Sequence, residues 1–265
     1  MKKYCVVTYI FNNYELVREP WVVDENCDYY LFTDNKETTS QNWKVIYVEK
    51  LDTDSLSGIQ KALMVKYSFY KYIPDIEQYE YFVAIDSSIL IQSSLNPIIE
   101  YLDRGKFDLS VAIHPGRDNF TDEYNVWIDT RGLDRKYKDL FFNSIKLYNP
   151  NRKGLIETTV KVFKNCRNTL QFIDDVNNIL LYSCNFEDKN DQCYFTYILS
   201  KYLDKLRINY HECQLYNNSE YMIRYLHGSD YYCCCDWYDF RGNKTIKFFD
   251  RLIRITDNNE YKLYL

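Results

Sequence analysis

The sequence predicts an α/β fold in which 265 residues form one domain, with a mostly parallel central sheet flanked by helices. Short apolar, β-rich segments recur along the chain, and segments with helical periodicity lie between them. The chain is 46% hydrophobic and 27% charged, which is the balance of a globular domain with a large core. After residue 206 the sequence is rich in Tyr and Cys and lacks clear periodicity, so we expect an irregular C-terminal portion.

The predicted strands are short runs of β-branched and aromatic residues bounded by polar loops. They are expected at residues 3–11, 27–32, 43–48, 79–85, 107–113 and 155–165, with a shorter apolar stretch at 89–91. Because these runs are short, largely apolar and separated by helical segments, they indicate the buried strands of a mostly parallel sheet.

Helices are expected where apolar residues recur every three or four positions. In the first, residues 55–72, this spacing runs from Ile59 to Tyr70, and Asp54 or Ser55 is the expected N-cap. The other helices are expected at residues 96–102, in parts of 119–147, at 169–182 and at 191–206.

Composition and charge exclude several classes of protein. A net charge of -5, a pI near 5.4 and the absence of a basic face argue against a nucleic-acid binder. The nine cysteines lack the CxxC spacing of zinc sites, so we expect reduced thiols in a cytoplasmic protein and assign no role to the Cys triplet at 233–235. The first apolar run is too short for a signal peptide, and no segment approaches the roughly 20 apolar residues of a membrane span.

Polar residues at the ends of predicted strands are the most informative, because open α/β sheets bind ligands beyond the carboxyl ends of their strands. These residues are Thr8, Tyr9, Asp34, Asp86, Ser88 and His114. Asp86 follows a strongly apolar strand, and residues i and i+2 of an extended segment project to the same side, so Ser88 would lie beside it. Such a carboxylate and hydroxyl would hold Mg²⁺ or Mn²⁺ together with diphosphate oxygens, or a ribose. Asp and Ser are also common in turns, so a plain turn is the alternative.

Residues 83–89 (VAIDSSI) resemble the apolar strand and Asp-x-Ser/Asp motif of GT-A glycosyltransferases. The chain is also similar to the bacterial and plant glycosyltransferase family described as DUF616, or TOD1/MUCI70-like. Further segments that match in order are KYSFYKYIP at 66–74, IHP at 113–115 with Arg117 and Glu123, GLIETT at 154–159, and Asp191-Gln192 with Phe195. Tyr70 stands where that family carries a His, and Val83 or Ala84 where it carries an aromatic residue.

The resemblance implies a Rossmann-like GT-A domain and a metal-dependent glycosyltransferase. It would move a sugar from a nucleotide-sugar, with a UDP-sugar as the expected donor, to a glycan acceptor, in a setting such as capsular or surface polysaccharide synthesis. About residues 1–115 would bind the nucleotide-sugar, 116–235 would face the acceptor, and 236–265 would form a C-terminal extension. The enzyme would lack a transmembrane segment and reach the membrane only through other synthesis proteins.

The resemblance also implies roles for single residues. Thr8, Tyr9 and Asp34 would hold the base and ribose, and Lys66, favoured over Lys61, would bind the diphosphate. The metal, Mn²⁺ or Mg²⁺, would be held by Asp86, Ser88 and His227. His114 would face the acceptor, and the catalytic carboxylates would be Glu157 and Asp191. Structural readings stay open beside these roles: core packing for Tyr9, a turn for Asp34, a buried structural His114, and a helix N-cap for Asp191.

Two other functions are the alternatives to a glycosyltransferase. A non-catalytic nucleotide-sugar or carbohydrate binding protein would keep Tyr9 and Asp34 without needing Asp86. A dinucleotide-binding enzyme or a methyltransferase would need a glycine-rich loop after the first strand, but residues 11–14 (FNNY) contain no glycine. The sequence also lacks a Walker-type phosphate loop and a Ser-His-Asp arrangement in a recognised context.

Overall fold

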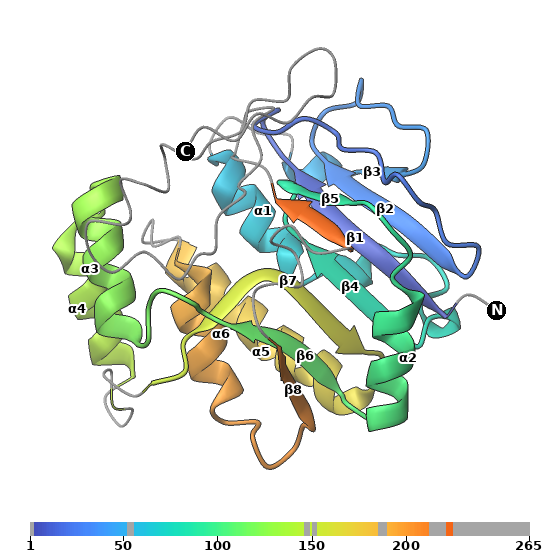
Figure 1. Cartoon of the computed structure of the whole chain (residues 1–265). Coiled ribbons are helices and arrows are strands. Elements are labelled where there is room, and N and C mark those ends of the chain that lie inside the picture. Colours follow the sequence, from blue (N-terminus) through green and yellow to red (C-terminus); the bar gives the residue numbers. More distant parts are fainter. Residues whose placement is uncertain are drawn as a thin grey trace, which may run out of the picture.

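The computed structural model describes residues 3–51, 56–145, 149, 153–184, 190–211 and 221–224. Its centre is a seven-stranded sheet in the order β3-β2-β1-β4-β7-β6-β8 (Figure 1). The strands are β1 Tyr4–Ile10, β2 Cys27–Thr33, β3 Lys44–Tyr47, β4 Tyr81–Ile85, β6 Leu109–Ile113, β7 Ile156–Lys164 and β8 Ile208–His211. β7 runs antiparallel to both of its neighbours, and all other neighbouring pairs are parallel. The predicted mostly parallel α/β sheet is therefore confirmed.

The sheet is buried on both faces because its strands carry apolar residues at successive positions. In β1, for example, Val6 contributes to one core, whereas Val7 and Tyr9 contribute to the other. Consecutive side chains of a strand point to opposite faces, so one seven-residue apolar run supplies both cores.

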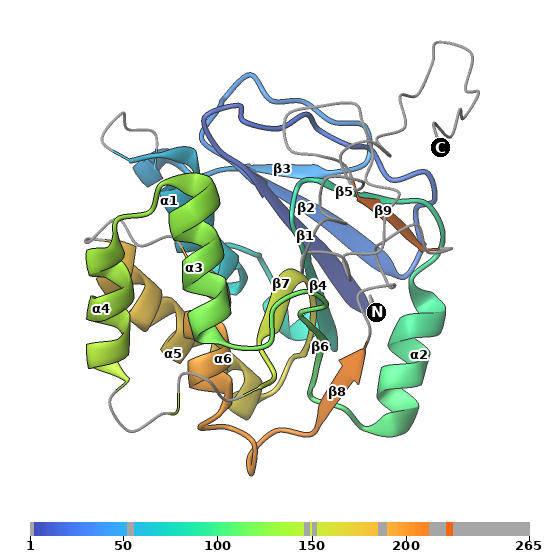
Figure 2. The same ribbon diagram turned by 60° about the vertical axis from the view of Figure 1, so that its left-hand side comes forward.

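Helices cover the two faces unequally. The helices are α1 Gly58–Lys66, α2 Asn96–Gly105, α3 Phe120–Arg131, α4 Arg135–Ser144, α5 Arg167–Cys184 and α6 Asp191–Leu199. α1, α5 and α6 pack on the face that carries Val7 and Tyr9. On the other face lie α2 and a small antiparallel sheet of β5 Ile89–Ile91 with β9 Met222–Arg224. Figures 1 and 2 show α3 and α4 side by side at the end of the molecule remote from α2.

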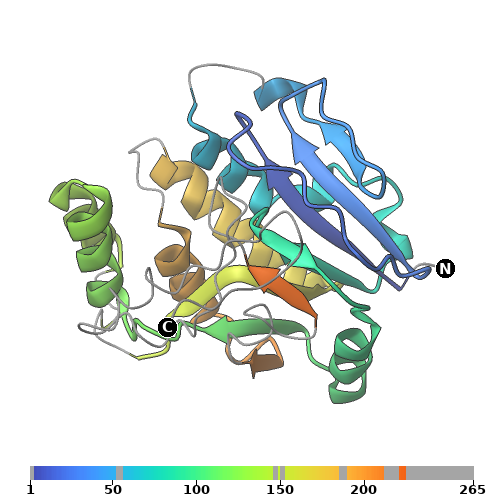
Figure 3. The same ribbon diagram turned by 45° about the horizontal axis from the view of Figure 1, so that its top comes forward.

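The strand order places a topological switch point between β1 and β4. From β1 the chain moves to β2 and then to β3 on one side, and it returns to place β4 on the other side of β1. Figure 3 shows these strands next to one another, with β1 to β3 in blue and β4 in teal. In an open α/β sheet, ligands bind beyond the carboxyl ends of the strands at such a point. The fold therefore directs attention to the residues that follow β1 and β4.

Several predicted boundaries are wrong, for local reasons. α1 begins after Ser57, not after Asp54 or Ser55, because Ser57 and Gln60 form a reciprocal capping box. The helix predicted for residues 55–72 ends at Lys66 and is followed by a short 3-10 turn. α6 ends at Leu199, and β8 and β9 were missed because each is only three or four residues long and includes polar residues.

No helix within the described ranges is long and apolar enough to cross a bilayer. Of the cysteines whose side chains the structure describes, Cys5, Cys27 and Cys193 are buried and Cys166 is half-buried, and these four form no disulfide among the described residues.

Candidate functional site at the carboxyl ends of β1 and β4

Asp86 lies directly after β4, at the switch point. Its backbone N–H donates to the Thr159 carbonyl at 2.9 Å, and its own carbonyl accepts from the Ile89 N–H at 3.0 Å. The segment after β4 is thus a turn and not the extended run expected. Side chains two positions apart lie on the same side only in an extended segment, so the expectation that Ser88 lies beside Asp86 does not hold. The Asp86 side chain is 22% exposed, so its carboxylate is open to solvent on one side.

Lys66, the last residue of α1, joins two carboxylates. Its Nζ lies 2.9 Å from Asp86 Oδ1 and 2.9 Å from Asp191 Oδ2, so these two oxygens are at most twice that distance apart. Burial by itself would lower the pKa of Lys66, but the Asp191 and Asp86 carboxylates outweigh it and raise that pKa well above its usual value. The ammonium is therefore charged and holds the two carboxylates together.

Asp191 is anchored through one of its oxygens. Besides Lys66, Asp191 Oδ2 accepts hydrogen bonds from the Tyr67 hydroxyl and the Thr158 hydroxyl, each at 2.9 Å. The N-cap of α6 is Asn190, whose side chain accepts from the Cys193 N–H, so capping is not the role of Asp191. Asp191 Oδ1 has no hydrogen bond within the described residues and is the oxygen left for a ligand.

Tyr9 completes what we call the switch-point cluster, which comprises Tyr9, Lys66, Tyr67, Asp86, Thr158 and Asp191. The Tyr9 hydroxyl donates to Asp86 Oδ1 at 3.4 Å. Burial raises the pKa of both Tyr9 and Tyr67 well above the usual value, so both phenols stay protonated and act as donors. At 2% exposure Tyr9 also belongs to the core, so a ring stacked on a base is not what this structure presents.

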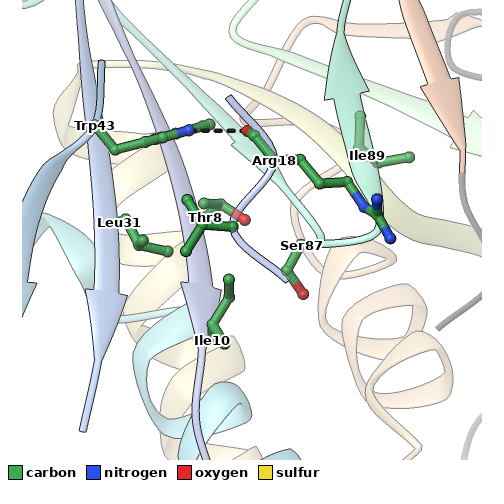
Figure 4. A pocket seen from close by; sticks show the side chains of 8 residues that line it. Thr8, Ile10, Arg18, Leu31, Trp43, Ser87 and Ile89 are labelled. Atoms are coloured by element: carbon green, nitrogen blue, oxygen red, sulfur yellow. Dashed lines mark hydrogen bonds between the residues drawn. The ribbon is translucent and has the colours of Figure 1, made fainter. Parts of the chain in front are cut away.

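Thr8 lies on the opposite face of β1, away from the switch-point cluster. Its buried Oγ1 has no hydrogen-bond partner within the described residues. Thr8 lines a small pocket of about 200 Å³, open mouth included, together with Ile10, Val17, Arg18, Leu31, Trp43, Ser87 and Ile89 (Figure 4). The space enclosed within it is only about 10 Å³, against the 300–1,000 Å³ of typical small-molecule pockets, so the pocket by itself does not fit a nucleotide.

A second lysine, Lys161 on β7, lies fully buried behind the cluster. Its Nζ donates to the Thr158 carbonyl and lies 5.5 Å from the centre of the Tyr67 ring. Burial, and then the Lys66 ammonium, lower the pKa of Lys161 to about 7, against the raising effect of the nearby carboxylates. Near neutral pH this side chain is therefore poised between amine and ammonium.

Asp34 forms a separate group on the other side of the β1 end. One carboxylate oxygen accepts the Asn12 N–H at 2.9 Å, and the other is paired with the Lys61 ammonium. Lys61 also donates to the Asn12 side chain at 2.6 Å. Both oxygens of Asp34 are thus engaged within the protein, and Lys61 serves this group instead of the switch-point cluster.

His114 and Glu157 are both sealed in the interior at 2% exposure. His114 Nδ1 accepts the N–H groups of Gly116 and Arg117 at 3.1 and 3.0 Å, so the ring closes its own turn. Glu157 accepts both the N–H and the hydroxyl of Thr159. Both residues therefore stabilise local structure here, and neither has solvent access to an acceptor.

The residues proposed for a metal fit a cation that arrives with its own oxygen ligands. Mg²⁺ is usually held by one or two carboxylates plus substrate phosphates. Asp86 offers a partly exposed carboxylate, and the fully buried Ser88 hydroxyl has no partner within the described residues. No group of three or more His, Cys, Asp or Glu side chains suited to a metal occurs in the described part of the chain, and His227 lies outside it. A dedicated metal cage is therefore not present there.

A scan of known protein-family models gave no match to this chain, and a search of curated proteins gave no significant match either.

Sequence reasoning named Tyr9, Lys66, Asp86 and Asp191 as candidates, in separate roles, but missed Tyr67, Thr158 and Lys161. One signal could have found Lys161, because it is an ionisable residue within an apolar strand, TTVKVF. Thr158 could not be found in this way. It depends on an irregularity at which Val111 of β6 pairs with Lys161 and the next residue, Ala112, pairs with Glu157.

Proposed function

We propose that the protein is a glycosyltransferase that moves a sugar from a nucleotide-sugar, with a UDP-sugar as the expected donor, to a glycan acceptor. One observation carries the proposal: at the switch point, one ammonium and two carboxylates, Lys66 with Asp86 and Asp191, come together beside solvent. A nucleotide-sugar carries a diphosphate and sugar hydroxyls side by side, and these are the groups that an ammonium and a carboxylate bind.

Each member of the cluster has a definite task in this proposal. Lys66 pairs with the diphosphate, which takes over from the carboxylates as its partner. Asp191, held through Oδ2 by Tyr67 and Thr158, keeps Oδ1 for a sugar hydroxyl. Because Oδ2 is fixed by three donors, the carboxylate is oriented before the ligand arrives, which reduces the entropy lost on binding.

A divalent cation bound with the donor would contact Asp86, whereas Ser88, turned away from an extended course and fully buried, is not available to it. It would stabilise the negative charge that develops on the departing nucleoside diphosphate. This role requires a single carboxylate from the described residues, which matches the oxygen donors found there.

The first test is a thermal-shift screen of UDP- and GDP-sugars with and without Mn²⁺. A nucleotide-sugar at about a hundred times its dissociation constant should stabilise the fold by roughly 2–3 kcal/mol. Glu25→Gln removes an exposed carboxylate outside the site, so this variant should be stabilised by the same nucleotide-sugars as the unmodified protein. If no nucleotide-sugar stabilises the protein, either with or without Mn²⁺, the proposal is wrong.

The alternative is a protein that binds a nucleotide-sugar or carbohydrate without acting on it. Asp86→Asn separates the two, because only catalysis needs the charge at this position during departure of the nucleoside diphosphate. Donor hydrolysis that disappears in Asp86→Asn while donor binding persists favours the enzyme. Binding without any hydrolysis or transfer in the unmodified protein favours the binding module.

A further inference from the structure

The fully buried Lys161 has no task in the proposed function, although it lies next to the groups that do. Its Nζ donates to the carbonyl of Thr158, the residue whose hydroxyl holds Asp191. A lysine ammonium has three N–H donors, and within the described residues Lys161 has this single acceptor and the face of the Tyr67 ring. By contrast, Lys66 Nζ has Asp86, Asp191 and the Thr158 hydroxyl around it. Lys161 is therefore the cation that the cluster does not fully satisfy.

The charges around Lys161 come from every element packed on it. They are Lys66 at the end of α1, Asp86 after β4, Asp191 at the start of α6 and Glu157 of β7 itself, and the uncharged Tyr67 ring lies against the ammonium. The Glu157 carboxylate is paired with Arg224 at 3.7 Å, so the balance concerns the remaining groups. With Lys161 neutral, a single ammonium faces the two carboxylates of Asp86 and Asp191, and these groups carry one net negative charge. With Lys161 protonated, two ammoniums face the same two carboxylates, and these groups are together neutral.

We propose that Lys161 is a positioning residue for the diphosphate of the donor: when it is protonated, it loosens the hold of the two carboxylates on Lys66 and allows the Lys66 ammonium to meet the anion. This inference rests on the proposed function, because it assigns the diphosphate to Lys66. Lys161 itself is sealed from solvent and contacts no ligand, so it acts only through the charge that it adds beside Lys66.

The direction of the effect follows from the sign of the charges. Burial and the Lys66 ammonium lower the pKa of Lys161 to about 7, so its proton is bound below pH 7 and lost above it. Diphosphate binding should thus be tighter at pH 6, where the cluster is neutral, than at pH 8.5, where it is negative. A unit charge roughly 10 Å from the anion, behind Lys66, changes affinity by roughly fivefold to tenfold at an effective dielectric constant of about 25–35.

The test compares the unmodified protein with Lys161→Met, an uncharged side chain of similar length, and Lys161→Arg, a permanent cation. UDP-glucose serves as the probe in calorimetry at pH 6 and 8.5, with EDTA present, because its diphosphate diester keeps the same charge at both values. The unmodified protein should lose roughly fivefold to tenfold in affinity between pH 6 and pH 8.5. Both variants should give a nearly flat profile, weak for Lys161→Met and tight for Lys161→Arg. Equal pH profiles in the unmodified protein and Lys161→Met would overturn the proposal.

A second measurement does not depend on a ligand. Nuclear magnetic resonance of the lysine ε-CH₂ groups should show Lys161 titrating near pH 7 and the Lys66 signal shifting in step with it. In Lys161→Met the Lys66 signal should stay constant across the same range. If no UDP- or GDP-sugar binds any variant, with or without Mn²⁺, while the two lysines remain coupled, the proposed function fails and the coupling stands. If the Lys66 signal does not shift as Lys161 titrates, the inference is wrong, whether or not a nucleotide-sugar binds.

Discussion

At the scale of single residues, the site depends on one ammonium between two carboxylates. Lys66 is 7% exposed in its side chain, and Asp86 and Asp191 approach its Nζ at equal distances. A charge this deeply buried is tolerated only when it is paired, because the loss of hydration must be offset by close partners. The three residues therefore form a unit, and the removal of one member affects the others.

Replacing Lys66 by Met should destabilise the fold, because it leaves two carboxylates facing each other without a cation. Breaking a buried ion pair in this way costs about 3–5 kcal/mol, and the partial exposure of Asp86 favours the lower end of that range. Urea unfolding measures the loss. Lys66→Arg, which keeps the charge, is the matched control and should lose far less. Equal stability of Lys66→Met and Lys66→Arg would show that the ion pairs are not structural.

Replacing Lys161 by Met should remove a pH dependence of stability. An unperturbed lysine, as in the unfolded chain, has a pKa of 10.5, and burial lowers the pKa of Lys161 in the folded protein to about 7. Between these two pH values the unfolded chain therefore binds one more proton than the folded protein. Stability then rises with pH, by up to about 1.4 kcal/mol per pH unit, and the cost of burying the charge is fully present below pH 7.

The measurement is urea unfolding of both proteins at pH 7, 8 and 8.5. As the pH rises, the free energy of unfolding of the unmodified protein should increase relative to that of Lys161→Met. Lys164→Met removes a lysine from the same strand outside the cluster and controls for the change of residue type. Parallel stability curves for the unmodified protein and Lys161→Met would contradict a buried lysine that titrates near neutrality.

At the scale of elements, two local features aim the side chains of the cluster. The capping box at the start of α1 fixes where that helix begins and hence that Lys66 and Tyr67 lie at its end. The register shift in β7 opposite Val111 and Ala112 adds residues to one strand, and Thr158 lies among them. Helix start and strand irregularity together bring Lys66, Tyr67 and Thr158 to Asp191.

Replacing Ser57 by Ala should lower stability by about 1 kcal/mol, because the Gln60 N–H loses the hydroxyl that caps it. The same change should weaken donor binding modestly, since α1 carries Lys66. Thermal unfolding and calorimetry measure the two effects. Ser57→Asp keeps a capping oxygen and should behave like the unmodified protein; a Ser57→Asp protein as unstable as Ser57→Ala would point to packing and not capping.

At the scale of the whole molecule, the sequence predicted the sheet class and six of its strands because long apolar runs such as β1 and β4 leave little choice. It could not predict β8, whose four residues are half exposed and gain their structure by pairing with β6. At the site, strand ends revealed Asp86, but Thr158 came from an irregular register that periodicity does not encode. His114 follows β6 directly, as expected, and Glu157 is the second residue of β7; at 2% exposure both are structural residues. The position of a residue along a strand can thus be predicted from sequence. Its exposure to solvent cannot, because it depends on which other segments of the folded chain pack against it.

The account rests on the claim that the switch-point cluster holds a nucleotide-sugar for transfer. The most direct measurement is the rate of nucleoside diphosphate release from a panel of UDP- and GDP-sugars with Mn²⁺, in the unmodified protein and in Asp86→Asn. We predict release from at least one donor, and a loss of about a hundredfold or more in Asp86→Asn, as expected when a group that stabilises developing charge is removed. Release at the same rate in Asp86→Asn, or no release from any donor, would contradict the account.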